Sequence, residues 1–75
     1  MASIGDYYIK YPNGSDGCII RRITSVNNNI VGYVFKFIPK GKLELHDWLF
    51  GQTAYIDVIG HKMTTVERII YDIED

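Results

Sequence analysis

Two neighbouring stretches of this chain, residues 18–26 and residues 30–38, are rich in β-branched and aromatic side chains. Between them lie Asn27, Asn28 and Asn29, and asparagine tolerates the left-handed backbone conformation that tight turns require. β-branched and aromatic residues favour strands. The pattern therefore predicts a long β-hairpin over residues 18–38, around which the rest of the chain is arranged.

Both faces of this hairpin are apolar. In the second strand, one face carries Val31, Tyr33, Phe35 and Phe37, and the other face carries Ile30, Val34, Lys36 and Ile38. We assign Val31, Phe35 and Phe37 to the core, which turns Lys36 outward. A hairpin with one wet face would show a clean polar side, and neither strand does. The second face must therefore be covered, either by the C-terminal half of the chain or by another molecule.

Weaker alternation predicts further strands over residues 6–11 and 53–59. The first of these ends at Pro12, which cannot donate a hydrogen bond to a sheet, and a turn-rich segment follows over residues 12–17. Gly60, His61 and Lys62 are expected to form the next turn. These strands flank the hairpin in sequence and can extend it into a sheet.

Two segments carry helical signals. Leu45, Trp48 and Leu49 form a stripe at helical spacing, with Gly51 placed as a C-terminal cap, and predict a short helix at about 43–50. Residues 64–73 are ambiguous. Thr64 to Glu67 fits a capping box that would start a helix, whereas Ile69, Tyr71 and Ile73 alternate as in a strand. We favour the strand and keep the helix as the alternative.

The chain is therefore expected to form a single compact domain, residues 1–75, of the mainly β class. Its predicted architecture is a small five-stranded SH3-like or OB-like barrel, or a curled antiparallel sheet, with the one short helix near residues 43–50. The alternative is an α+β fold with a C-terminal helix at about 65–74. The order of turns and strands resembles SH3-type barrels in outline, although no residue motif carries that resemblance.

Composition and charge narrow the function classes. The chain has a single cysteine, so an internal disulfide is excluded. It has no signal-peptide pattern and no apolar run near the roughly 20 residues that span a bilayer, so we expect a cytoplasmic protein without a membrane partner. Residues 1–42 carry six basic and two acidic residues, a formal charge of +4. Residues 43–75 carry two basic and seven acidic residues, a formal charge of −5.

No catalytic, metal or cofactor site is predicted. Cys18, His46, His61 and the acidic residues show no spacing that would assemble a nucleophile with a base. None of them forms the close-spaced ligand pair of a zinc site. Gly41 and Lys42 lack the rest of a phosphate-binding loop. The sequence therefore predicts a protein that is not an enzyme.

A protein-binding module is the expected function, either an inhibitor or an accessory subunit that acts by surface contact with a larger protein, or a homodimer. Tyrosine, tryptophan, phenylalanine and arginine are enriched at the hot spots of protein interfaces. The candidate contact residues are Tyr8, Tyr11, Arg21, Arg22, Tyr33 and Lys36 in the basic half and Asp57, Glu67 and Asp72 in the acidic half. The alternative is a small barrel that binds single-stranded nucleic acid or RNA, because aromatic residues lie among basic ones.

Overall fold

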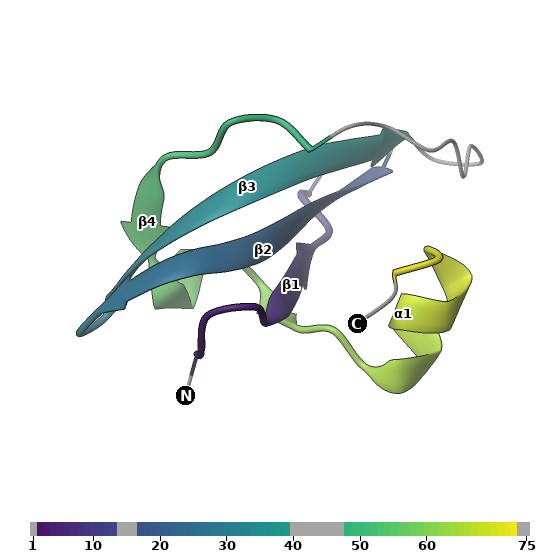
Figure 1. Ribbon diagram of the computed structural model, residues 1–75. Coiled ribbons are helices and arrows are strands. Elements are labelled where there is room, and N and C mark those ends of the chain that lie inside the picture. The colour runs from purple at the N-terminus through teal and green to yellow at the C-terminus, as the bar shows by residue number, and fades with distance from the viewer. Residues whose placement is uncertain (1, 14–16, 40–47, 74–75) are drawn as a thin grey trace.

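A computed structural model describes residues 2–13, 17–39 and 48–73. The fold is mainly β, with one open antiparallel sheet of five strands in the order β4-β3-β2-β1-β5 and one short helix, α1 (Figure 1). The strands are β1 (Tyr7–Lys10), β2 (Gly17–Asn27), β3 (Ile30–Pro39), β4 (Thr53–Tyr55) and β5 (His61–Lys62). A 3₁₀ turn covers Ile56–Val58, and α1 covers Thr65–Ile70. The predicted mainly β fold class is confirmed, and the sheet is open rather than closed into a barrel.

The long hairpin is confirmed as the centre of the sheet. Strands β2 and β3 pair from Gly17 opposite Pro39 to Asn27 opposite Ile30, and the turn between them has Asn28 at φ 58°. Asparagine thus supplies the left-handed position that the turn requires. The register shifts once, between Ile23 and Ser25, so the pairing continues past an irregularity in β2. In Figure 1 the hairpin spans the molecule, with β4 near its tip and α1 near its other end.

The segment after β4 differs from the favoured prediction. Residues 61–62, expected as a turn, form the edge strand β5 beside β1, and Thr65–Ile70 forms α1 instead of a strand. The helix starts at a complete capping box, in which Thr64 Oγ1 accepts from the Glu67 N–H and Glu67 accepts from the Thr64 N–H. Two backbone donors that a helix start leaves unpaired are satisfied in this way. The alternative of a C-terminal helix is therefore the one observed.

Most of the helix predicted at about 43–50 lies outside the described residues. Its last three residues are not helical, so the prediction is wrong for them. Leu49 forms an isolated antiparallel bridge with Phe35, in which each backbone N–H donates to the other's carbonyl over 3.1 and 2.7 Å. Pairing with the free edge of β3 satisfies these groups without a helix.

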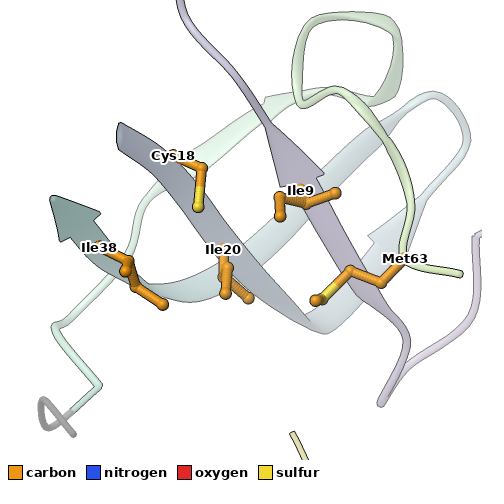
Figure 2. Packing of buried hydrophobic residues seen from close by; sticks show 5 residues of the cluster. All are labelled: Ile9, Cys18, Ile20, Ile38 and Met63. Carbon is orange, nitrogen blue, oxygen red and sulfur yellow. The ribbon is translucent and has the colours of Figure 1, made fainter. Parts of the chain in front are cut away.

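The described core consists of two clusters on opposite sides of the sheet. The first contains Ile9, Cys18, Ile20, Ile38 and Met63, which Figure 2 shows gathered over β1, β2 and β3. Trp48 and the residues that follow α1, Tyr71 and Ile73, pack against this first cluster. The second contains Tyr8, Ile23, Val31 and Ile59. No helix among the described residues is long and apolar enough to cross a membrane.

The side chains of β3 that are buried differ from those predicted. Val31 is buried as expected, but Phe37 is 41 % exposed and Lys36 is only 9 % exposed, so the assignments of Phe37 to the core and of Lys36 to solvent are wrong. Trp48 and the segment around α1 cover the side to which Lys36 and Ile38 belong. Alternation along the strand then leaves Phe37 on the less covered side.

Candidate binding face

One side of the sheet carries a row of apolar side chains that the described chain leaves partly uncovered. In the register of the sheet, Lys10 lies opposite Ile19 and Ile19 opposite Phe37, while Arg21 lies opposite Phe35 and Phe35 opposite Leu49. Directly opposed residues share a face, as do residues two apart along a strand. We call this set the open face; it consists of Lys10, Ile19, Arg21, Tyr33, Phe35, Phe37 and Leu49.

The open face borders the second core cluster, which occupies the remainder of the same side. There, Ile59 and Ile56 cover Ile23 and Val31. This cover does not extend along β3 to its C-terminal end: Phe37 is 41 % exposed and Leu49 is 55 % exposed. Exposed aromatic and aliphatic side chains next to one another form the kind of apolar surface that marks a binding site in soluble proteins.

The charge of the open face is positive, since Lys10 and Arg21 are accompanied by no carboxylate in the set. The guanidinium carbon of Arg21 lies 4.8 Å from the centroid of the Tyr33 ring, a cation–π contact. The Tyr33 ring in turn meets Phe35 edge-on, with centroids 6.2 Å apart. Nε and Nη1 of Arg21 are buried and have no hydrogen-bond partner. Arg21 therefore holds a partly desolvated charge within an apolar surface.

The other predicted basic contacts lie on the opposite side of the sheet. Arg22 lies 5.9 Å from the ring centroid of Tyr7, and the Lys36 ammonium lies 4.3 Å from that of Trp48. Tyr7 and Trp48 also contact each other, with centroids 6.0 Å apart. The basic half of the sequence is thus divided between two surfaces, because successive residues of a strand point to opposite sides.

A second group of polar side chains gathers around Glu67, at the start of α1. The Glu67 carboxylate accepts hydrogen bonds from the Thr64 N–H at 2.9 Å and from the Tyr11 hydroxyl at 3.0 Å, and it lies 2.9 Å from His61 Nε2. Burial raises the pKa of Glu67, but these hydrogen bonds outweigh it and the net pKa is lowered. Glu67 is therefore ionised at neutral pH and links α1 to β5 and to the residue that follows β1.

This group extends toward Cys18 through Tyr71, whose side chain interacts with those of Tyr11 and Cys18. Burial raises the pKa of the Cys18 thiol, and burial together with the interactions with Tyr71 and Glu67 raises the pKa of Tyr11. Both groups are therefore protonated at neutral pH. A protonated, buried thiol is a poor nucleophile, so Cys18 is not activated for nucleophilic attack. The contacts of the cluster instead attach α1 to the sheet.

The remaining predicted contact residues do not join either group. Tyr8 belongs to the second core cluster and is 8 % exposed. Asp57 is exposed on the 3₁₀ turn, and Asp72 is exposed beyond α1 at φ 55°. The structure brings Arg21 together with Tyr33, and Tyr11 together with Glu67, but it assembles no single surface from all nine residues.

Five members of the open face were not predicted as contacts: Lys10, Ile19, Phe35, Phe37 and Leu49. For Ile19, Phe35 and Phe37 the sequence did contain a signal, because both faces of the hairpin are apolar, whereas Lys10 and Leu49 lie outside the hairpin. Pattern alone did not identify which face would be left uncovered.

Within the described residues, no group of three or more histidine, cysteine, aspartate or glutamate side chains is placed to hold a metal ion. In comparisons with known proteins, no family model, curated protein or solved structure matches the chain.

Proposed function

We propose that this chain is a protein-binding module that contacts a larger protein through the open face. The observation that carries the proposal is the exposure of Phe37 and Leu49 beside the partly desolvated charge of Arg21. Aromatic residues and arginine are the side chains most enriched at interface hot spots, where a partner removes them from water. Binding of this kind suits an inhibitor or an accessory subunit.

The open face fits a protein better than it fits a nucleic acid. Single-stranded nucleic acids bind by stacking bases on aromatic rings and by tracking phosphates with several cations. Here the Arg21 guanidinium lies over the Tyr33 ring, where a base would stack, and among the described residues of the open face only Lys10 and Arg21 are cationic. Arg22 and Lys36 lie on the other side of the sheet and cannot extend the same track.

A contact surface built from the acidic half, residues 43–75, has less support. Glu67, one of its predicted contacts, already accepts three hydrogen bonds or close polar contacts within the chain. Asp57 and Asp72 are exposed but lie on separate elements, the 3₁₀ turn and the segment after α1. We therefore base the proposal on the open face alone.

Affinity capture from the native host tests the proposal. The wild type is compared with Phe37→Ser, which removes the most exposed ring of the open face, and with Phe50→Ser as the matched control. Phe50 is 97 % exposed and neighbours Leu49, but it is outside the open face. We expect a protein captured by the wild type and by Phe50→Ser to be lost with Phe37→Ser.

Retention of the same partners by Phe37→Ser would show that the open face is not the binding surface. Light scattering after size exclusion covers the case in which the partner is a second copy. A dimer that Phe37→Ser dissociates would support the proposal. A monomer at high concentration, together with no captured partner, would contradict protein binding altogether.

A further inference from the structure

We propose that the partner segment that covers the open face is acidic, with an aspartate or glutamate carboxylate placed against Arg21 and apolar side chains on either side of it. This inference rests on the proposed function and names the chemistry of the partner. Its basis is the pairing state of Arg21 and the character of the residues around it.

Arg21 lacks a counter-charge within the described part of the chain. Its ring contact with Tyr33 is the interaction that the fold supplies, and two of its three nitrogens are buried without an acceptor. A buried donor left unsatisfied is costly, and a charged one more so. Arg21 as a whole is only half-buried, so a carboxylate brought by a partner would pair with the accessible part of the guanidinium and offset the charge that these two nitrogens share.

Two other cations, Lys62 and Arg22, are in different situations. Lys62 Nζ lies 3.6 Å from an Asp6 carboxylate oxygen. Arg22 is exposed and remains hydrated while it lies over Tyr7. Arg21 is thus held in an apolar surface without an acid, whereas its neighbour on the other side of the strand is in water. This difference between adjacent arginines provides a matched pair for experiment.

The apolar part of the inferred segment follows from the residues beside Arg21. Phe35 lies directly across the sheet from it, Leu49 lies beyond Phe35, and Ile19 precedes it by two residues on the same face. A partner that supplied a carboxylate alone would leave these side chains in water. Apolar residues flanking the acid would bury them and also shield the ion pair from solvent, which strengthens it.

Selection from a displayed library of short random peptides tests the inference with a defined probe. The full chain serves as bait in three forms: wild type, Arg21→Met and Arg22→Met. Methionine keeps much of the length and apolar volume of arginine while removing its charge. Thermal unfolding of each form first establishes that both variants fold. The best-enriched peptide is then synthesised with its acidic residue and with the corresponding amide.

We expect enriched peptides to share an acidic position flanked by apolar residues with the wild type and with Arg22→Met, and to lose that position with Arg21→Met. Replacing the acid by its amide should weaken binding to the wild type about tenfold, as the loss of a charge-assisted hydrogen bond implies, and should leave binding to Arg21→Met unchanged.

Enriched motifs without an acid, or the same acidic motif with Arg21→Met, would overturn the inference and leave the proposed function standing. Failure to enrich any peptide would also count against it, while the capture experiment with Phe37→Ser decides the proposed function separately. A single-stranded oligothymidylate that displaces the selected peptide at moderate salt would favour a phosphate ligand and refute the acidic protein segment.

Discussion

Removal of the Glu67 carboxylate should loosen the attachment of α1 to the sheet and lower the stability of the whole domain. The Glu67→Ala variant loses the acceptor for the Thr64 N–H, for the Tyr11 hydroxyl and for the His61 ring. These contacts join α1 to β5 and to Tyr11, which directly follows β1 and is far from both in the sequence. α1 itself contributes no buried residue, so this carboxylate is a principal link between the helix and β1 and β5.

The magnitude follows from the contacts. Loss of a helix cap costs about 1 kcal/mol, and a hydrogen bond to an ionised carboxylate contributes about 1–2 kcal/mol where the group is partly shielded from water. The Glu67 side chain is 16 % exposed, so it is shielded, whereas His61 is 55 % exposed and adds less. We expect Glu67→Ala to lower the free energy of unfolding by about 3 kcal/mol, from a total near 4–11 kcal/mol for a domain of this size.

Urea unfolding followed by the fluorescence of Trp48 measures this change, since Trp48 is the single tryptophan and packs against the first core cluster. Asp72→Asn is the control, because Asp72 is an exposed acid close to the same helix. A loss below about 1 kcal/mol with Glu67→Ala, or equal losses with the two variants, would refute the role assigned to this carboxylate.

The same site makes stability depend on pH in a defined direction. The pKa of Glu67 is lower in the folded than in the unfolded chain, so its ionised form stabilises the fold above the unfolded pKa. That contribution is lost as pH falls through the lower, folded pKa. The stability difference between the wild type and Glu67→Gln should therefore be present at neutral pH and shrink as the pH falls through the folded pKa of Glu67. A difference that stays constant throughout the acid range in which the protein remains folded would show that charge is not involved.

Three further predictions concern the fold. Gly60→Ala should lower the free energy of unfolding by more than about 2 kcal/mol in thermal unfolding, because Gly60 has φ 93° and an added Cβ would overlap the Ile9 carbonyl. Gly5→Ala is the control: Gly5 has φ 92° but open space around it, so the loss should be only the backbone strain of about 1–2 kcal/mol. Equal losses would show that contact with Ile9 is not limiting. Ile20→Ala should lower the free energy of unfolding by about 2–5 kcal/mol in urea, since Ile20 is fully buried at the centre of the sheet, and a loss under 1 kcal/mol would contradict that packing. Cys18 should react with a thiol reagent such as Ellman's reagent many times more slowly in the native than in the unfolded chain, because it is buried and its pKa is raised; comparable rates would contradict its burial.

Local signals in the sequence predicted the elements whose conformation depends on a few neighbouring residues. The hairpin followed from strand-favouring residues on both sides of an asparagine cluster, and Asn28 adopts the left-handed conformation expected there. The capping box at Thr64 and Glu67 was also visible, although alternation in the following residues favoured a strand. The capping box was the stronger signal because its two hydrogen bonds satisfy backbone donors at the start of the helix. A strand over the same residues would have needed a free strand edge to pair with, and the edge of β1 is already paired with β5.

The candidate binding face could be predicted only in part. Arg21 and Tyr33 were identified as contacts, since arginine and tyrosine among apolar residues are typical of interfaces. Phe35 and Phe37 were instead assigned to the core, because a bulky aromatic residue on an alternating strand is usually buried. Their neighbours Lys10, Ile19 and Leu49 come from other segments of the chain, and only the register of the sheet brings them together.

By itself, the sequence determined that the chain forms a β-rich domain around one hairpin, and that both faces of this hairpin would need cover. The tertiary structure decided which face receives it. Trp48, Met63 and the residues after α1 pack over the face that holds Ile20 and Lys36, while Ile59 covers only part of the other. Alternation specifies two faces but does not rank them when both are apolar, because the choice depends on contacts between residues far apart in the chain. The part left uncovered is the face on which the proposed function depends.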